Sequence, residues 1–396
     1  MTIFWKRQSK FLLAALAVWA TAGVVQAEEP IRIGFSTSKT GIFAQANASE
    51  INAYELWRDQ VNATGGLDIN GKKRPVVFVS YDDQSNPAQA VKIYEKLITD
   101  DKVDLLLAPW GTPFQLAIAP VMERFKFPLV GNTAASVQLR KIKPGYIWFP
   151  TSAIPDKMGI ELASMMKRQG VTSAAIIANV LPFSQEIKSF LLPALAKEGI
   201  KVVFDQDYPP DIKDMTTVLD AAKKASPGAM IALSYPADSL LFAQQAKELG
   251  LVAPFTFALV GPAMDFFQKA LGPTAADHVV TIGHWSPNRA EWRKAKPFFD
   301  AYVAKYHEIP DHLDSVLSYV SCEILQQAVA AAGLDRQKLK DVIASSTFDT
   351  INGPVKFSGV ENAVTPTAFL EIQGHSIELI WPPAIATAKF QPKSSW

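Results

Sequence analysis

A short segment at residues 108–114 combines residue types suited to holding a small polar molecule. Tryptophan, glycine, threonine and proline occupy positions 110–113, between an apolar run and a segment of helical period. A helix that begins near Pro113 directs free backbone N–H groups and a partial positive charge at this loop, which suits a carboxylate. Thr112 either caps that helix or turns its hydroxyl toward a ligand. The segment therefore predicts a binding loop for a small anion.

A second segment with the same chemistry follows the next apolar run. Residues 128–136 end in Thr133, Ala135 and Ser136, with only small or polar side chains after position 130. Small side chains let backbone amides approach an anion closely, and the carboxyl ends of parallel strands are where such sheets bind ligands. Two successive strand ends of this kind favour a binding site over helix capping alone.

Three other motifs resemble catalytic or metal sites without meeting their requirements. The segment 66–73 is similar to a phosphate-binding loop, but it leaves a helix and enters a strand, and Lys73 stands where Ser or Thr must bind Mg²⁺. His307 and His312 are five apart, and Pro310 breaks the helix that would present both to a metal. Because no segment pairs a nucleophile with a base, we expect no enzyme, cofactor or metal.

The composition is that of a globular export product without a nucleic-acid-binding surface. The chain has 396 residues, of which 48% are hydrophobic, with 39 Lys and Arg against 38 Asp and Glu. Residues 1–27 carry Lys6, Arg7 and Lys10 before a short apolar core and end in small residues, which predicts a cleavable signal peptide. Cys322 is the only cysteine, and its helical-period surroundings predict a buried thiol.

The elements that position these residues alternate between short β-rich runs and longer segments of helical period. The first series has strands at 31–36, 75–81, 103–107 and 128–130 and helices at 49–61, 87–99 and 113–125. The second has strands at 173–178, 201–204, 229–233 and 255–259 and helices at 182–197, 214–224 and 236–249. Two such series predict an α/β protein with two lobes, each a parallel sheet covered by helices. A helical tract at 291–345 and later strands complete the lobes if the chain crosses back.

Several segments in order give the chain a family resemblance. They are 31–41, 65–71, 81–87, the loop around Trp110, and 128–133. Together they resemble the periplasmic solute-binding proteins of ABC importers, in the branched-chain amino-acid (Leu/Ile/Val) family, over about residues 28–390. The resemblance implies a type I periplasmic-binding fold, in which two Rossmann-like lobes joined by three crossovers close on a ligand. It assigns 28–150 with about 284–348 to lobe 1, and 151–283 with about 349–396 to lobe 2.

The resemblance also implies which residues hold the ligand's carboxylate. Thr112 matches the family's carboxylate-binding serine, and Thr133 and Ala135 match the positions that serve the same group from the next loop. The family usually has threonine at the position of Ala135, so one hydroxyl is missing here. Ser136 is a candidate to replace it.

On the second lobe the resemblance predicts contacts with the rest of the ligand. Phe183 falls at an aromatic contact, and Tyr235 matches the tyrosine beside the ligand's ammonium. The position of the acidic partner of that ammonium is Gly261, so the expected carboxylate is absent there. Asp265, four residues later, is a candidate substitute, because a buried ammonium without a carboxylate partner is costly.

Four aromatic residues are candidates to contact the end of the ligand opposite its carboxylate. Phe43, Trp110, Phe183 and Trp285 either line the pocket or belong to the core. As pocket walls they favour an apolar or aromatic ligand tail.

The sequence therefore predicts a periplasmic, non-catalytic binding protein that delivers a small carboxylate solute to an inner-membrane ABC permease. The expected solute is a branched-chain or other hydrophobic amino acid. The alternatives are an aromatic or aliphatic acid, or an amide, that lacks the amino group. An exported ligand sensor and a hydrolase that uses the same cleft are the alternatives from other functional classes.

Overall fold

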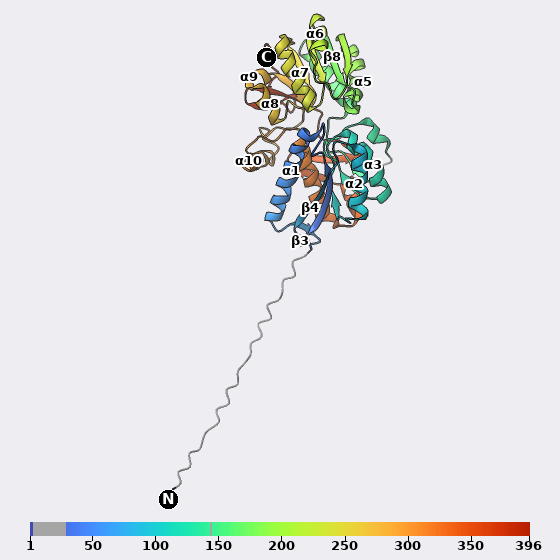
Figure 1. Cartoon of the computed structure of the whole chain (residues 1–396), viewed down its shortest axis with the longest axis vertical. Helices are drawn as coiled ribbons and strands as arrows, with labels where there is room; N and C mark the ends of the chain where they lie inside the picture. The colour runs from blue at the N-terminus through green and yellow to red at the C-terminus, as the bar shows by residue number, and fades with distance from the viewer. Residues whose placement is uncertain (3–28, 143–144) are drawn as a thin grey trace.

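The structure is a computed structural model that describes residues 1–2, 29–142 and 145–396. In these residues the chain folds into two α/β lobes that lie end to end (Figure 1). The predicted signal peptide, residues 1–27, lies outside the described residues apart from its first two. The two βα series of the sequence thus correspond to two separate layered units.

The first lobe consists of parallel strands covered by helices. Its strands are β1 (Ile31–Thr37), β4 (Val76–Asp82), β5 (Leu105–Leu106), β6 (Leu129–Val130) and β7 (Ile147–Trp148). Its first helices are α1 (Ala44–Ala63), α2 (Pro87–Thr99), α3 (Thr112–Phe125) and the 3-10 turn η1 (Val137–Lys141). β1 lies between β4 and β5, and β6 pairs in parallel with β7. All residues of β1 except Arg32 are buried, as expected for a central strand covered on both faces.

The second lobe contains a seven-stranded sheet in the order β17-β16-β12-β11-β10-β8-β9. These strands are β8 (Ser173–Asn179), β9 (Lys201–Tyr208), β10 (Ala229–Leu233), β11 (Phe255–Ala258), β12 (Val279–Ile282), β16 (Phe369–Gln373) and β17 (Ser376–Trp381). The helices of this lobe are α4 (Pro155–Arg168), α5 (Pro182–Lys197), α6 (Thr216–Lys224), α7 (Pro236–Leu249), α8 (Asp265–Leu271) and α9 (Pro273–Ala276). The sheet is parallel except at β16, which runs antiparallel to β12 and β17.

The last quarter of the chain crosses back and completes both lobes. After β12 it forms α10 (Ala295–Tyr306), α11 (Asp314–Ala332), α12 (Arg336–Ser345), β13 (Thr347–Thr350), β14 (Gly353–Ser358) and β15 (Glu361–Asn362). α11 packs on α1, β13 contacts α11, and β14 contacts α12, so these elements belong with the first lobe. The chain then returns to the second lobe through β16 and β17. We therefore propose that the third crossover follows Asn362, later than the position near 349 that the resemblance implies.

Several helices predicted from the sequence are confirmed with identical bounds. These are α2, α5 and α7, each of which begins with a proline in its first turn. Cys322 is confirmed as a buried thiol in α11, and burial raises its pKa well above the usual range. α1 begins at Ala44, five residues before the predicted start.

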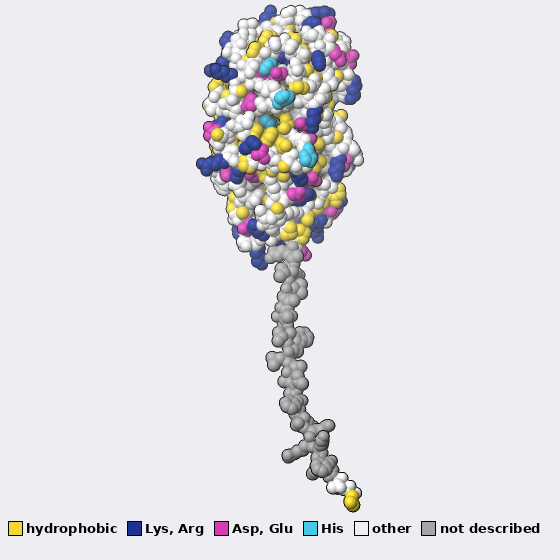
Figure 2. All heavy atoms as spheres, turned by 90° about the vertical axis from the view of Figure 1, so that its left-hand side faces the viewer, with side chains coloured by type: hydrophobic (Ala, Val, Ile, Leu, Met, Phe, Trp, Pro, Cys, Tyr) yellow, Lys and Arg dark blue, Asp and Glu magenta, His cyan; other side chains and the backbone are white. Residues whose placement is uncertain are grey.

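The surface carries charges of both signs. Figure 2 shows lysine, arginine, aspartate and glutamate side chains scattered among apolar ones on one face, without a continuous patch of one sign. Within the described ranges, no helix is both long enough and apolar enough to cross a membrane.

The segment similar to a phosphate-binding loop is a β-hairpin. β2 (Leu67–Ile69) pairs antiparallel with β3 (Lys72–Arg74), which confirms the glycine-rich turn. Gly66 has φ +108°, and a Cβ added there would lie 2.0 Å from the carbonyl oxygen of Arg74. This close approach of two backbone segments, rather than an anion, explains the glycine.

Replacing Gly66 is expected to destabilise the protein more than replacing its neighbour in the same hairpin. Gly71 also has a positive φ, +84°, but a Cβ there meets no atom within 4 Å. Gly71→Ala should cost about 1–2 kcal/mol of unfolding free energy through backbone strain alone. Gly66→Ala should cost at least about 2 kcal/mol more, because Arg74 must move. Equal losses in urea unfolding would contradict this account.

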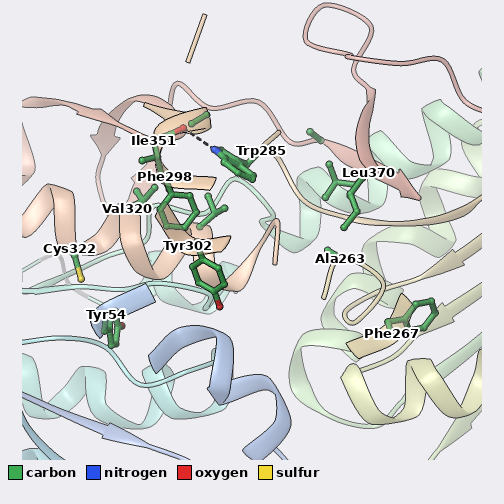
Figure 3. Packing of buried hydrophobic residues seen from close by; sticks show 14 of the residues in the cluster. Tyr54, Ala263, Phe267, Trp285, Phe298, Tyr302, Val320, Cys322, Ile351 and Leu370 are labelled. Carbon is green, nitrogen blue, oxygen red and sulfur yellow. Dashed lines mark hydrogen bonds between the residues drawn. The ribbon is translucent and has the colours of Figure 1, made fainter. Parts of the chain in front are cut away.

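Two buried histidines lie where the chain crosses between the lobes. Figure 3 shows Trp285 in the surrounding core, with its indole N–H donating to the carbonyl oxygen of Ile351 at 2.9 Å. The ring of His312 meets Trp285 edge-on at 4.9 Å between centroids, and His284 lies beside Asn352, with 2.6 Å between its Nδ1 and the amide nitrogen. Burial lowers the pKa of His284 to about 4 and of His312 to about 3.

These histidines are expected to make the protein less stable in acid. Below pH about 6.5 the unfolded chain binds a proton at His312 that the folded chain does not bind, so stability falls as pH falls. Relative to a His312→Gln variant, the wild type should lose about 1.4 kcal/mol of unfolding free energy per pH unit between about pH 6 and pH 4. Urea unfolding across this range measures the difference.

Candidate ligand-binding cleft

The first turns of four helices meet at the junction of the two lobes. α3 and α11 belong to the first lobe and α5 and α7 to the second, and a residue at the start of each lines the same cavity: Thr112, Asp314, Phe183 and Tyr235. Helix N-termini present unpaired N–H groups and partial positive charge. The cavity is therefore a favourable environment for an anionic group.

On the first lobe the two predicted binding loops are hydrogen-bonded to each other. The backbone N–H of Gly111 donates to the hydroxyl of Thr133 at 2.8 Å. The Thr112 hydroxyl donates to the carbonyl oxygen of Ala135 and accepts from its N–H, each at 3.1 Å. The two strand ends thus form a single hydrogen-bonded unit, which we call the loop ledge (residues 110–112 and 133–135) and in which every side chain except that of Trp110 is small. The Thr112 hydroxyl joins these two loops, whereas the sequence left open a helix cap or a ligand contact for this residue.

A buried polar network supports the loop ledge from behind. Asn132 donates to the carboxyl of Glu50 and, at 2.8 Å, to the hydroxyl of Tyr54. Tyr54 donates in turn to the carbonyl oxygen of Ala108 at 3.0 Å, and Gln115 donates to the side chain of Asn132. Burial raises the pKa of Glu50 well above its usual value, while the bond from Asn132 opposes this shift. The sequence analysis did not identify this network, because Glu50 lies within a helical pattern like any other polar residue.

Aromatic rings from both lobes form one wall of the cleft. The ring of Trp110 lies 5.3 Å from Phe43 and 6.3 Å from Tyr235, and Phe43 lies 5.9 Å from Tyr235, all between centroids. Phe43 and Trp110 belong to the first lobe and Tyr235 to the second, so these contacts span the lobe interface. All three rings are buried.

The cavity beside these rings contains about 370 Å³ of space not occupied by atoms, part of which is open to solvent. Its remaining lining is small or apolar: Gly111, Thr133, Thr151, Ala153, Val260, Ile282 and Leu313. No described residue accepts a hydrogen bond from the buried hydroxyl of Tyr235. Burial, and then the nearby carboxyl of Asp238, raise the pKa of this tyrosine, so it stays a neutral donor.

Asp314 is a cavity residue that the sequence analysis missed. Its carboxylate accepts a hydrogen bond from the indole N–H of Trp110 at 2.8 Å. Asp311 accepts bonds of 2.6–3.1 Å from three backbone N–H groups at the start of α11 and so caps that helix. Two aspartates three residues apart before a helical segment do indicate a cap. Nothing in the sequence indicates that the second one faces the cleft.

The structure also shows what stands at the two positions considered for an acidic partner. Gly261 has φ +132°, and a Cβ there would lie 3.1 Å from the Cβ of Ser239 and 3.3 Å from Pro236. A side chain at this position would therefore need a strained backbone conformation and a small shift of Ser239 or Pro236 at the start of α7. Asp265 begins α8, forms an ion pair with Lys269, and does not line the cavity.

The predicted site residues divide into two groups. Trp110, Thr112, Thr133, Phe183 and Tyr235 line the cavity, and Phe43 packs on two of them. Ala135 lies behind Thr112, and Ser136 accepts a hydrogen bond from the N–H of Gln138 and so caps η1. Trp285 is fully buried in the core between the lobes (Figure 3). In the part of the chain that the structure describes, no three His, Cys, Asp or Glu side chains are placed to hold a metal.

Comparisons with known proteins agree with this architecture. Residues 30–375 match the model of a family described as periplasmic binding protein. The Leu/Ile/Val-binding protein homolog 7 of Brucella suis biovar 1 is 24% identical over 354 residues, covering 85% of this chain and 86% of that protein.

Two solved structures share the fold at low sequence identity. One is the branched-chain amino acid transporter substrate-binding protein LivJ of Streptococcus pneumoniae in complex with isoleucine, with a TM-score of 0.80, 21% identity, and 89% of this chain and 100% of that one covered. The other is a solute-binding protein of an ABC transporter from R. palustris in complex with benzoate, with a TM-score of 0.78, 21% identity, and 93% and 98% covered. The similarity extends over both lobes.

Removing the hydroxyl that joins the loop ledge is expected to destabilise the protein. Thr112→Val leaves the buried N–H and C=O of Ala135 without a partner, which should lower the unfolding free energy by about 1–3 kcal/mol. Thr112→Ser keeps the hydroxyl and should lose less than half of that. Thermal or urea unfolding distinguishes the two variants, and an equal loss in both would mean that the methyl group, not the hydroxyl, matters.

Proposed function

Because this chain belongs to the periplasmic binding protein family and has its type I fold, we propose that it captures a small carboxylate solute for an ABC importer. The solute class that we favour is a branched-chain or other hydrophobic amino acid. The observation that carries the proposal is the cavity between the lobes, where the loop ledge and four helix N-termini face an aromatic wall.

The loop ledge is the proposed site of the ligand's carboxylate. It carries the hydroxyls of Thr112 and Thr133 beside the first turn of α3. Backbone N–H groups at a helix N-terminus bind carboxylates without a cationic side chain. Among the described residues the cavity wall contains no lysine or arginine, and the hydroxyls of Thr112 and Thr133 already donate to Ala135 and Asn132, so the helix N-terminus is the group available to this anion.

The aromatic wall is the proposed site of the ligand's side chain. Phe43, Trp110, Phe183 and Tyr235 offer apolar faces from both lobes. A ligand that touches both lobes stabilises their contact, so binding favours closure of the cleft. The lobes already share a hydrogen bond at the rim, from the N–H of Val137 to the carboxylate of Glu186 at 3.0 Å.

An acid without an amino group is the second candidate ligand. The aromatic wall suits such a ligand, and the R. palustris protein described above binds benzoate within the same fold. Position 261 offers no carboxylate for an ammonium. The two ligand classes differ in one group, the amino group, and can be compared directly.

The proposal includes the setting in which the protein works. We infer that it functions in the periplasm after removal of residues 1–27 and passes its solute to an inner-membrane ABC permease. The solute leaves unchanged, because no nucleophile and base converge on the cavity lining. We also propose that lobe 1 comprises 28–150 and about 284–362, and that lobe 2 comprises 151–283 and about 363–396.

Titration calorimetry with a matched ligand panel tests the proposal. The panel pairs leucine and isoleucine with 4-methylpentanoate, and adds valine, benzoate and isovaleramide. We expect saturable heat with the amino acids, a fall in the radius of gyration by small-angle X-ray scattering as the lobes close, and recovery of the solute unchanged. Binding heat with the deaminated acids alone would mean that the solute is an acid without an amino group, the second ligand class. No heat with any member, or conversion of the solute, would contradict a binding protein of this type.

A further inference from the structure

Among the described residues, Asp314 is the only Asp, Glu, Lys, Arg or His side chain in the wall of the cavity. It is the first residue of α11 and is almost wholly buried, with a single side-chain donor, Trp110. It reaches the cavity from the first lobe, close to the loop ledge. A solvent-shielded carboxyl in this position faces any ligand that the cleft admits.

The surroundings of Asp314 contain other carboxyls but no cation. Asp311 lies directly behind it, and Glu50 and Asp83 lie deeper in the first lobe. None of these four groups takes part in an ion pair among the described residues, and all four are buried. Burial first, and then the charge of Asp311, raise the pKa of Asp314 well above its usual value, while the bond from Trp110 opposes the shift. The ammonium group of a ligand would therefore be the first positive charge beside these four carboxyls.

A second polar group faces the same space without an acceptor for its proton. The hydroxyl of Tyr235 is buried in the cavity wall on the second lobe, where the backbone N–H of Phe183 is its neighbouring donor and no described residue accepts a bond from it. Its ring lies 6.3 Å from that of Trp110, the residue that binds Asp314. A buried O–H that lacks an acceptor is costly, so the cleft is incomplete without a polar ligand group here. A primary ammonium has three N–H donors and can serve both the carboxylate and the tyrosine oxygen.

We propose that Asp314 receives the ammonium group of the ligand and thereby selects α-amino acids over acids that lack the amino group. This inference rests on the proposed function and adds the residue that decides between its two ligand classes. Gly261 carries no acidic side chain, and Asp265 is paired with Lys269 outside the cavity. The acidic partner of the ammonium therefore comes from the first lobe, and the ammonium lies between Asp314 and Tyr235.

Ligand binding should then release a proton. In the empty cleft, burial and the charge of Asp311 raise the pKa of Asp314, and an ammonium beside it lowers that pKa. Affinity for an amino acid should therefore rise with pH until Asp314 is ionised in the empty protein as well. The other titratable groups that face it are Asp311 and Glu50 from the first lobe and Tyr235 from the second. His312, beside Asp311, has a pKa of about 3 and stays neutral.

The test compares leucine with 4-methylpentanoate, which differs from leucine in lacking the amino group. Calorimetry of the wild type in buffers of different ionisation enthalpy, between about pH 5 and pH 8, counts the protons released. We expect up to one proton released with leucine and none with 4-methylpentanoate. Asp314→Asn should weaken the binding of leucine at least about 30-fold and abolish the proton release, because the buried ammonium loses its charged partner. Its affinity for 4-methylpentanoate should stay the same or improve.

Two further variants keep the test decisive. Asp265→Asn removes a carboxyl outside the cavity and should bind leucine like the wild type. Trp110→Phe keeps a ring but removes the bond to Asp314, and should shift the pH midpoint of leucine binding upward. If Asp314→Asn fails to fold, the role of Asp314 is tested by the proton count of the wild type and by the shifted pH midpoint of Trp110→Phe.

The outcomes separate this inference from the proposed function. Undiminished leucine binding by Asp314→Asn would overturn the role of Asp314 and leave a leucine-binding protein in place. Binding of 4-methylpentanoate but not of leucine by the wild type would overturn the role and move the function to deaminated acids. Absence of binding by both ligands and by the wider panel would overturn the function itself.

Discussion

The hydrogen bond from Trp110 to Asp314 joins the parts of the chain on which the cleft depends. The indole N–H donates to Asp314 at 2.8 Å, and the same ring packs against Phe43 and Tyr235. Trp110 follows the third strand of the first lobe, Asp314 begins a helix that returns from the second lobe, and Tyr235 belongs to the second lobe itself. One side chain thus links the loop ledge, a returning helix and the opposite lobe. A shift in any of them changes the cavity that all three line.

The first lobe tolerates several buried carboxyls because hydrogen bonds, not cations, stabilise them. Asp83 accepts a bond from the hydroxyl of Ser36 at 2.7 Å, and Asp311 accepts three from backbone N–H groups. Glu50 is held by Asn132, which also positions the loop before Thr133. Such networks are stable when each member has a partner, and they hold neighbouring loops in one arrangement.

Much of the fold could be predicted from local sequence signals. α2, α5 and α7 begin where a proline suits the first helical turn, and their apolar residues repeat at helical spacing. α1 begins earlier than predicted because Asn47 and Glu50 are buried although polar, so they interrupt the apolar pattern near its start. α4 was not predicted, although its buried Met158 and Leu162 are spaced four apart.

By itself the sequence determined the layered α/β lobes and the strand ends that carry Thr112 and Thr133. This was possible because the carboxyl ends of parallel strands share one edge, so loops such as those at Thr112 and Thr133 meet in any such sheet. Only the tertiary structure decided which side chains face the cavity. It placed Trp285 in the core and Ser136 at a helix cap, and it brought Asp314 to Trp110 across 204 positions of sequence. The physical reason is that the chain returns between the lobes, and no local pattern specifies which residue of a returning helix will face a loop formed so much earlier.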